Sequence, residues 1–511
     1  MIKPSILNGL DRHQLGHLRR FDNLSRQPVN DWSGMKGRSV GQDDFGGYRF
    51  QLSYMAYALA LTHIHRLPAA PGVFKPVFER LFEKLLLPEV WLYWHNVSRG
   101  GTIFNKHLSH TYKEEFNPVG RDNIMYSAYV QSLALLYNYL FDDDRYAQPN
   151  AITFKHWSYF WGGEPKIFQY DQNSLNEHIY WQMAENGFLG VACEPNCIFQ
   201  ICNQPAILGF RLHDLLTGGN RAADIVRSYE AAWAEFGRIG ENGHYHVMVS
   251  QDSRTARPNG LKSPWVDAWN GALMNMWNRD FVHQHYPSQM ADLVVEAPGG
   301  TLTVNPSPRP PAMGEEIIND DCDFGWVSVW ASEMGDEDRL ARLLAHAERH
   351  MAPSWQDGGL FYPRNDQVFD ADGHRTLMEP HTGNVLLGYA RLNVPDGLWS
   401  LYNEPLDPAR FSQPALTEVS QGVEVSHAWF DPEQRVLTFR LRGGAATAGE
   451  IVIGRLEHFG EWTLGADGED IVSGSGNQIS SSPAAHARTS GDGIALRLPD
   501  GEWSDCVLVG K

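Results

Sequence analysis

The chain of 511 residues is longer than one ordinary hydrophobic core accommodates, so we expect two or three domains unless the fold is a large barrel or toroid. Hydrophobic residues make up 42% of the sequence and charged residues 20%, which excludes a disordered or fibrous protein. The formal net charge of -19, without any stripe of Lys and Arg, argues against nucleic acid as a partner.

The amino-terminal sequence and the cysteine content bear on the cellular compartment. The start, "MIKPSILNGLDRHQLGHLRRFD", has neither a long apolar stretch nor a small-residue cleavage site, and no later segment is apolar for long enough to span a bilayer. The odd number of five cysteines argues against a disulfide framework. We therefore predict a cytoplasmic protein without a membrane span.

Helical periodicity dominates from about residue 48 to residue 395, after an amino-terminal segment over 1–47 that we expect to contribute to the site. Apolar residues recur there at three- and four-residue spacing. The segments with this pattern are "RFQLSYMAYALALTHI", "NIMYSAYVQSLALLYNYLF", "PAILGFRLHDLL", "AADIVRSYEAAWAEF", "WNGALMNMWNRDFV", "WVSVWASEM", "DRLARLLAHAERHM" and "TGNVLLGYARL".

A weak repeat suggests how these helices are arranged. Three times a helical pattern ends in a short polar turn and a new helix is predicted with an arginine in its first turn, at Arg145, Arg221 and Arg339. Short turns make neighbouring helices antiparallel. We predict a mainly α fold in which residues 48–400 form an α/α toroid; a solenoid of similar hairpins would give the same local pattern.

Two later segments break the helical pattern. Residues 297–316, "APGGTLTVNPSPRPPAMGEE", are rich in Pro and Gly and predict a long loop. After about residue 415 the sequence alternates between polar and apolar residues, as in "VEVSHAWF", "RVLTFRLRG", "EIVIGRL", "IALRLP" and "CVLVG". We predict a small antiparallel β domain over residues 415–511.

Three of the five cysteines lie within "VACEPNCIFQIC" (191–202). Pro195 suits the first position of a helix, so we expect a helix to begin there, with Cys193 just outside it and Cys202 two turns further on. Both thiols would then line one cavity, with Cys197 as a bystander. A second ligand pair of the kind that zinc sites repeat is missing, apart from His107 and His110 in "HLSH", and burial as small apolar side chains is the alternative.

Several blocks in this order resemble the linalool dehydratase/isomerase family, from about residue 14 to residue 395. These blocks are "RDNIMYSAYVQSLALLYNYLFDDDRY", "GFLGVACEPNCIFQICNQPAILGF" and "ASEMGDEDRLARLLAHAE", with weaker matches in "SYMAYALA" and "SPWVDAW". The resemblance implies an (α/α)6 barrel that works without a cofactor or metal on a small isoprenoid alcohol. It also implies a homo-oligomer with the site near a subunit boundary.

The resemblance assigns roles to individual positions. Cys193 and Cys202 match the family's functional cysteines, and Asp22 in "RRFDNLS" matches a catalytic aspartate that, if partly buried, would have a raised pKa and donate a proton. Tyr129 stands where the family has a histidine, so it would form a hydrogen bond to the substrate oxygen rather than exchange protons near neutral pH. The positions assigned to the pocket are Phe50, Tyr54, Met125, Ile198, Phe199 and Trp269.

Our leading hypothesis is a cofactor-independent lyase, isomerase or cyclase that acts on a terpenoid or similar apolar alcohol by acid and base chemistry. A carbohydrate-active barrel enzyme is the second, because the acidic runs with Asp320, Asp321 and Asp323 and with Glu379 could supply paired carboxylates. A non-catalytic ligand-binding protein is the third, since 17 Trp, 19 Tyr and 24 Phe could line a binding pocket as well as an active site.

Overall fold

A computed structural model of the chain describes residues 9–37, 47–100, 105–108, 110–160, 163–305, 307, 322–443, 449–482, 487–497 and 501–511. The chain divides into two compact units. One contains Met1–Arg19, Ala58–Glu79 and Leu406–Lys511, and the other contains Arg20–Tyr57 and Arg80–Pro405. The division runs through helices α1 (Arg12–Ser25), α2 (Tyr48–His65) and α3 (Pro71–Leu85).

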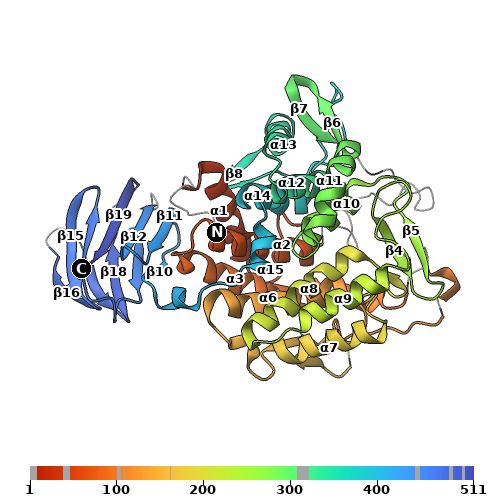
Figure 1. Ribbon diagram of the computed structural model, residues 1–511, viewed down its shortest axis with the longest axis horizontal. Helices are drawn as coiled ribbons and strands as arrows, with labels where there is room; N and C mark the ends of the chain where they lie inside the picture. Colours follow the sequence, from red (N-terminus) through yellow and green to blue (C-terminus); the bar gives the residue numbers. More distant parts are fainter. Residues whose placement is uncertain are drawn as a thin grey trace. The chain divides into compact units, whose positions relative to one another are not determined.

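The larger unit, Arg20–Tyr57 with Arg80–Pro405, is mainly helical, as the sequence predicts (Figure 1). Within it α6 packs against α8, α8 against α10, α10 against α12, and α12 against α14. The helices that lie wholly in this unit are α4 (Pro88–Trp91), α5 (Tyr93–Val97), α6 (Ile124–Phe141), α7 (Gln172–Glu185), α8 (Gln200–Thr217), α9 (Arg221–Trp233), α10 (Pro264–Met274), α11 (Arg279–Leu293), α12 (Asp323–Glu333), α13 (Glu337–His350), α14 (Leu387–Leu392) and α15 (Gly397–Asn403).

Burial separates two kinds of helix in this unit. Helix α6 is buried at every residue except Asn138, and α12 is buried throughout, because both are mainly apolar on all sides and the acids at the two ends of α12, Asp323 and Glu333, accept hydrogen bonds. Helix α13 buries only Leu343, His346 and Ala347 and exposes a charged face. The completely buried helices therefore form the centre of the unit, and amphipathic helices such as α13 cover it.

Short strands connect the helices of the larger unit. One sheet has the order β3-β4-β5, and three hairpins pair β1 with β2, β6 with β7 and β8 with β9. The bounds are β1 (Ile152–His156), β2 (Lys166–Tyr170), β3 (Cys197–Ile198), β4 (His246–Ser250), β5 (Thr255–Pro258), β6 (Val294–Ala297), β7 (Thr301–Val304), β8 (Ser354–Gln356) and β9 (Gly359–Phe361).

The smaller unit contains the carboxyl-terminal β region, and the predicted change to antiparallel strands is confirmed. Its strands form a four-stranded sheet, β10-β13-β18-β17, and a six-stranded sheet, β11-β12-β19-β14-β15-β16. Burial alternates along β12, as expected for a sheet with one covered face. The bounds are β10 (Ala415–Val419), β11 (Glu424–Asp431), β12 (Val436–Arg442), β13 (Glu450–Gly454), β14 (Glu461–Ala466), β15 (Glu469–Ser475), β16 (Gln478–Ser481), β17 (Ala487–Ser490), β18 (Gly493–Arg497) and β19 (Trp503–Gly510).

Residues from near the amino terminus belong to the same unit as these strands. The Leu416 N–H donates to the Ala69 carbonyl at 2.8 Å, and the Leu10 N–H donates to the Ser426 carbonyl at 2.7 Å. A Cβ atom on Gly72 would lie 2.6 Å from the Thr417 carbonyl, so a larger residue there would displace β10. The β region is thus completed by chain segments more than 300 positions earlier in the sequence.

Two local predictions need correction. Arg145 begins only a single 3-10 turn, Arg145–Ala147, because Pro149 and the left-handed Asn150 (φ 64°) follow and lead the chain into β1. The predicted loop over 297–316 contains strand β7 in its first part, and most of the remainder lies outside the described residues. Among the helices described, none has the length and apolar character needed to cross a membrane.

Candidate active site

The cysteine-rich segment forms a tight hairpin that leads into α8. Pro195 and Asn196 occupy a turn in which the Cys197 N–H donates to the Glu194 carbonyl at 2.9 Å, and the Cys193 N–H donates to the Cys197 carbonyl at 2.8 Å. The predicted helix start at Pro195 is wrong, because Asn196 adopts a left-handed φ of 72°, which a helix excludes but a turn with Pro at its second position favours. Helix α8 begins five residues later, at Gln200.

This hairpin brings the thiols of Cys193 and Cys202 together. Cys202 lies in the first turn of α8, and its thiol forms a hydrogen bond with the Cys193 thiol. Both side chains are almost fully buried, and burial raises the pKa of both thiols above the ordinary value. The hydrogen bond from Cys193 opposes this rise at Cys202 only, so Cys202 is the better placed of the two to carry a transient negative charge.

Met125 and Tyr129 of helix α6 lie beside the thiol pair. The Cys202 sulfur is 3.9 Å from the Met125 sulfur, and Tyr129 follows one helical turn later. The beginning of α6 is bonded to the hairpin, because the Asn123 N–H donates to the Cys193 carbonyl at 3.1 Å and the Ile124 N–H to the Ala192 carbonyl at 3.2 Å. We call Cys193, Cys202 and Met125 the thiol cluster.

Aromatic rings from α2, α6 and α10 gather next to the thiol cluster. The Tyr54 hydroxyl accepts hydrogen bonds from the Trp269 indole N–H at 2.6 Å and from the Tyr129 hydroxyl at 3.2 Å. The Phe50 ring packs edge-on against Tyr129 and Trp269, with ring centroids 6.2 and 5.4 Å apart. The sequence-predicted residues Phe50, Tyr54, Tyr129 and Trp269 therefore form one aromatic cluster, and burial raises the pKa of Tyr54 and Tyr129 well above the ordinary value.

The structure adds two residues to the aromatic cluster that the sequence reasoning missed. Trp326 of α12 stacks on Trp269 with centroids 4.6 Å apart. His381 is fully buried, with its ring 5.5 Å from that of Tyr54 and 5.9 Å from that of Phe50. Trp326 belongs to the predicted "WVSVW" stripe, whereas His381 lies in "MEPH", where only the acidic residue was considered.

A buried cation and an acid flank the thiols, and the cation was not predicted. The Arg49 guanidinium lies over the rings of Phe50 and Tyr93, 4.3 and 4.1 Å from their centroids. Its charge acts to lower the pKa of Cys193 and of Cys202, while the charge of Glu194 acts to raise them, and burial outweighs both. Arg49 is thus placed to stabilise a thiolate once one forms.

The remaining predicted site residues are Ile198, Phe199 and Asp22. Ile198 is buried in strand β3, and the half-buried Phe199 is the residue immediately before α8. The Asp22 carboxylate pairs with the Arg80 guanidinium at 2.7 Å and with the Arg26 guanidinium at 2.9 Å. Two arginine guanidinium groups thus pair with the Asp22 carboxylate, and its role in catalysis stays a prediction.

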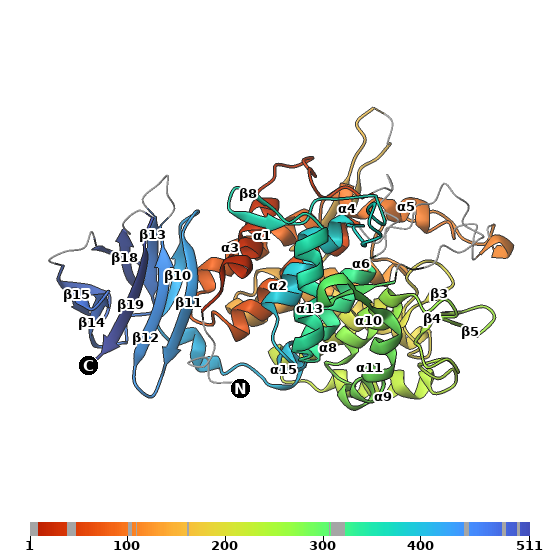
Figure 2. The ribbon, with the colours of Figure 1, turned by 90° about the horizontal axis from the view of Figure 1, so that it is seen from above.

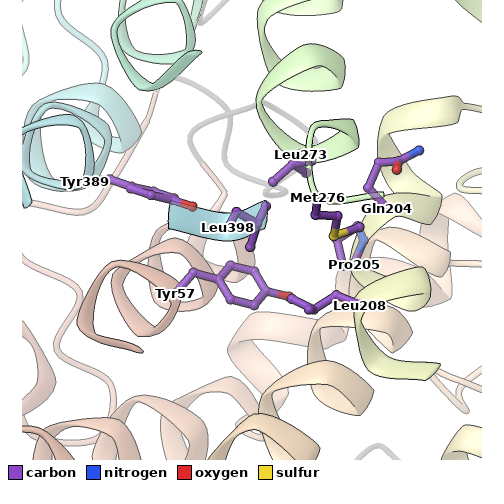
Figure 3. A pocket seen from close by; sticks show the side chains of 8 residues that line it. All are labelled: Tyr57, Gln204, Pro205, Leu208, Leu273, Met276, Tyr389 and Leu398. Atoms are coloured by element: carbon purple, nitrogen blue, oxygen red, sulfur yellow. The ribbon is translucent and has the colours of Figure 1, made fainter. Parts of the chain in front are cut away.

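A small apolar pocket adjoins the aromatic cluster (Figure 3). Tyr57 connects the two, because its ring packs edge-on against Tyr54 with centroids 5.5 Å apart and also faces the pocket. The Tyr57 hydroxyl shares a hydrogen bond of 2.6 Å with the Ser132 hydroxyl, so its orientation is fixed. The pocket is lined by Tyr57, Gln204, Pro205, Leu208, Leu273, Met276, Tyr389 and Leu398.

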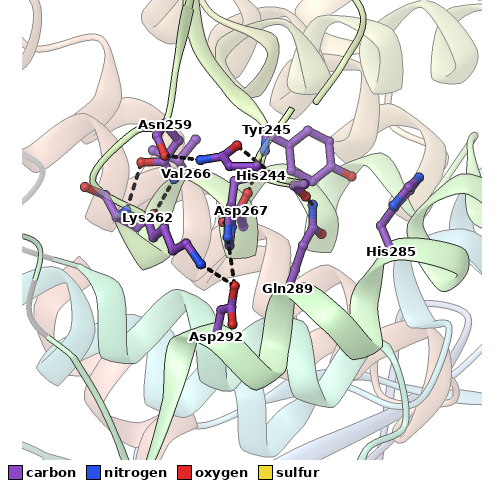
Figure 4. A network of polar contacts seen from close by, with 12 residues as sticks. His244, Tyr245, Asn259, Lys262, Val266, Asp267, His285, Gln289 and Asp292 are labelled. Carbon is purple, nitrogen blue, oxygen red and sulfur yellow. Dashed lines mark hydrogen bonds and ion pairs between the residues drawn. The ribbon is translucent and has the colours of Figure 1, made fainter. Parts of the chain in front are cut away.

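A buried polar network holds the strand that pairs with the cysteine hairpin (Figure 4). The Asp267 carboxylate accepts hydrogen bonds from His244 Nδ1 at 2.6 Å and from the Tyr245 N–H at 2.8 Å. Strand β4 begins at His246 and pairs through Ser250 with Cys197. The network therefore fixes β4 beneath the hairpin that carries Cys193.

Two carboxylates considered for carbohydrate chemistry have structural partners. Asp323 accepts from the Trp265 N–H at 2.7 Å and from the Ser307 N–H at 2.8 Å. Glu379 accepts from the N–H groups of His381 and Thr382, both at 2.5 Å. Both acids thus cap backbone segments, whereas Asp320 and Asp321 lie outside the described residues.

The histidines considered as partners of a cysteine zinc site lie in an exposed segment. His107 Nε2 is 2.8 Å from the Asp252 carboxylate and its side chain is 60% exposed. His110 is exposed as well. In the described part of the chain, the only group of three potential metal-binding side chains found combines His350, Asp370 and His374, which belong to neither cluster.

Comparisons with known proteins identify a family and several distantly similar structures. The model of one protein family, described as linalool dehydratase/isomerase, matches residues 49–368, which is more than half of the chain. The matched range contains every residue of the thiol cluster and the predicted residues of the aromatic cluster. His381 lies beyond it.

Several solved structures share a distant likeness with the chain. An inactive variant of an α-1,6-mannanase from Salegentibacter sp. HEL1_6, in complex with α-1,6-mannotriose, is 12% identical, covers 75% of this chain and 99% of its own, and has a TM-score of 0.42. A protein from Listeria innocua is 10% identical over 75% of this chain and 96% of its own, with a TM-score of 0.42. An α-amylase from Clostridium perfringens is 9% identical over 68% and 85%, with a TM-score of 0.34.

Proposed function

The chain belongs to the linalool dehydratase/isomerase family, and from this premise we propose that it is a lyase or isomerase acting on an apolar allylic alcohol of the terpenoid type. The observation that carries the proposal is a pair of buried thiols, in which Cys193 donates a hydrogen bond to Cys202, next to a cluster of aromatic rings. Elimination of a hydroxyl group needs both a proton donor and a proton acceptor in a site that excludes water.

One thiol plays both roles in turn, and the hydrogen bond from Cys193 stabilises the charged form of Cys202. The S–H of one cysteine donates its proton to the hydroxyl oxygen, the C–O bond breaks, and its electron pair leaves with water. A thiolate and an allylic cation remain. The thiolate then takes a proton from the carbon next to the cation, which forms a diene and restores the thiol.

The same intermediate accounts for the other outcomes of this chemistry. If water adds to the opposite end of the allylic cation and the thiolate takes its proton, the product is an isomeric alcohol. If a distant double bond of the substrate attacks the cation first, the product is cyclic. Which product forms therefore depends on how the cavity folds the substrate chain.

The surroundings of the thiols support the charges that this route creates. Arg49 acts to lower the pKa of Cys202, which favours the transient thiolate. The faces of Tyr54, Tyr129, Trp269 and Trp326 offer electron-rich surfaces to the cation. Tyr129 keeps its proton because burial raises its pKa, so we assign it to holding the substrate oxygen rather than to proton exchange.

We extend the proposal to the architecture. Tyr54 of α2 has ring contacts with Tyr129 of α6, Trp269 of α10, Trp326 of α12 and Tyr389 of α14. These contacts support an (α/α)6 barrel in which α2 completes the ring of inner helices between α14 and α6. Asp22, from the amino-terminal segment, would join the site by releasing its arginine partners when substrate or a second subunit binds, as the family resemblance implies.

The test is to incubate the protein with a panel of allylic isoprenoid alcohols and to analyse the products by mass spectrometry. Dehydration gives a product lighter by one water, whereas isomerisation or cyclisation without water loss leaves the mass unchanged and shifts the retention time. Cys193→Ala and Cys202→Ala should each lower turnover by about 10²- to 10⁴-fold, the usual contribution of a positioned acid or base.

Cys197→Ala is the matched control, because Cys197 lies in the same hairpin and is buried, yet its sulfur is directed to the Asn105 amide at 4.0 Å. It should retain most of the turnover. Near-normal activity of both the Cys193 and the Cys202 variants would refute the assignment. Turnover of an oligosaccharide that survives both substitutions would favour a carbohydrate-active enzyme instead.

A further inference from the structure

His350, Asp370 and His374 lie together although they come from two segments of the larger unit. His350 is the last residue of α13, while Asp370 and His374 flank the tip of a hairpin. The potential ligand atoms of the three side chains all lie within 4.8 Å of one another, and His374 Nδ1 is 3.0 Å from the Asp370 carboxylate. We propose that these three residues bind a divalent cation of the zinc type.

The hairpin tip holds Asp370 and His374 in place without a cation. One Asp370 carboxylate oxygen accepts hydrogen bonds from the N–H of Asp372 at 3.0 Å and of His374 at 2.8 Å. Gly373 turns the chain with a φ of 83°, and a bridge between Phe369 and Arg375 closes the hairpin. The other Asp370 oxygen therefore faces the His374 ring.

His350 is placed against this hairpin by its neighbours. Its ring stacks on that of His374, with centroids 4.1 Å apart and planes inclined by 17°. One helical turn earlier, His346 Nε2 donates to the Arg375 carbonyl at 3.0 Å, so the end of α13 is bonded to the residue next to His374. The backbone thus holds the three side chains close together before a cation arrives, and binding requires reorientation of the imidazole rings.

Metal binding requires neutral imidazole and ionised carboxylate. Two imidazoles stacked this closely cannot both carry a proton at low cost, and burial together with the charge of His374 lowers the pKa of His350. The N–H groups around Asp370 lower the pKa of its carboxyl group. The side chains of His374 and Asp370 are 18% and 35% exposed, so a cation can reach them from solvent.

The chemistry of the three side chains determines which cation they prefer. Two imidazole nitrogens and one carboxylate suit Zn²⁺ and its relatives Co²⁺ and Ni²⁺, whereas Mg²⁺ and Ca²⁺ prefer oxygen ligands throughout. Zinc bonds of about 2.0–2.1 Å require the two stacked imidazole rings to turn out of their stack until a nitrogen of each points to a common centre, with a fourth position left for water. Because neither the thiol cluster nor the aromatic cluster supplies a ligand, the cation would brace α13 against the hairpin.

Cobalt provides the test, because Co²⁺ bound to nitrogen ligands absorbs visible light. The full-length protein is treated with a chelator, dialysed and titrated with Co²⁺, and then with Zn²⁺ in competition. We expect one Co²⁺ per chain, displaced by Zn²⁺, and a higher melting temperature with Zn²⁺ than without it. His350→Ala and His374→Ala should each weaken Co²⁺ binding by at least about tenfold, and Asp370→Asn should weaken it while retaining a hydrogen-bond acceptor at the hairpin tip.

His107→Ala is the matched control, because His107 pairs with Asp252 at 2.8 Å on the surface and belongs to no group of three potential ligands among the described residues. It should bind Co²⁺ like the unaltered protein. The melting temperatures without metal show whether each variant is folded. No Co²⁺ uptake by the unaltered protein, or equal uptake by folded His350 and His374 variants, would overturn the proposal, and neither result depends on enzymatic activity.

Discussion

The thiol cluster and the aromatic cluster meet on helix α6, yet they are built in different ways. The thiols depend on the backbone: Asn196 in a left-handed turn, Gly190 with a φ of 127°, and hydrogen bonds from Asn123 and Ile124 to the hairpin. The rings of the aromatic cluster stand on regular helices and are held by mutual packing and by the Tyr54 hydroxyl. The chemistry of the first cluster is thus sensitive to backbone changes, and that of the second to side-chain volume.

The largest effect that separates the clusters should follow Trp269→Ala. Trp269 is fully buried against Trp326 and Phe50, so its removal leaves a cavity among large rings. We expect the free energy of unfolding to fall by about 3–5 kcal/mol. Denaturant titration measures the loss, and Trp181→Ala serves as the control because Trp181 is 56% exposed. Equal losses for the two variants would contradict the central role of the aromatic cluster in the core.

A backbone substitution should act on the thiol cluster instead. In Gly190→Ala, the new Cβ would lie 2.7 Å from the Asn203 amide nitrogen, and the φ of 127° would be strained. That amide group holds the Val191 N–H at 2.8 Å and the Phe199 carbonyl at 2.9 Å, so the hairpin should shift. We expect a loss of stability of about 1–3 kcal/mol from the strained backbone, with a loss of turnover.

Gly187→Ala is the matched control for this change. Gly187 also has a positive φ, 62°, but nothing lies within 4 Å of a Cβ built there. The substitution should lower the free energy of unfolding by only about 1–2 kcal/mol, and turnover per folded molecule should not change. If both variants retain normal turnover, the position of the hairpin does not govern the chemistry.

The Tyr54 hydroxyl offers a finer test of the aromatic cluster. Tyr54→Phe removes the acceptor 2.6 Å from the buried Trp269 indole N–H, and a buried donor that loses its acceptor costs about 1–3 kcal/mol. Tyr129→Phe removes only a donor to the same hydroxyl, which should cost about 0.5–1.5 kcal/mol. Unfolding of both single variants and the double variant gives the coupling energy. A larger loss for Tyr129→Phe would contradict this order.

The contrast between side chains on regular helices and side chains positioned by an irregular backbone also explains how much of the fold and site was predictable. The long helices and the strands β11, β12 and β13 have strong periodicity, so they were located from sequence. Strands β14 to β16 were missed because "EWTLGADGEDIVSGSGNQISS" is rich in Gly, Ser and acidic residues. Tyr54, Tyr129 and Trp269 lie on regular helices, where spacing indicates which residues share a face.

Other parts of the site depend on contacts that sequence spacing does not reveal. Strand β3 exists because Cys197 pairs with Ser250, more than fifty positions away, and no local pattern indicates that pairing. The helix start at Pro195 failed for the same reason, since a proline suits the second position of a turn as well as the start of a helix. His381 precedes a π-helical turn, Thr382–Leu386, whose register a 3.6-residue period does not describe.

The last prediction concerns the contribution of Cys202 to the pH dependence of stability. Burial raises the pKa of this thiol in the folded state, whereas in the unfolded chain it is about 8.5. The folded state therefore keeps a proton that the unfolded state releases, so the stabilisation is present below the unfolded pKa and is lost as the pH rises above it. The loss approaches about 1.4 kcal/mol per pH unit for one thiol. Denaturant titrations of the unaltered protein and of Cys202→Ala between neutral and alkaline pH measure this loss. The free energy of unfolding should decline less steeply with pH in the variant. Parallel declines would mean that the Cys202 thiol titrates normally in the folded protein.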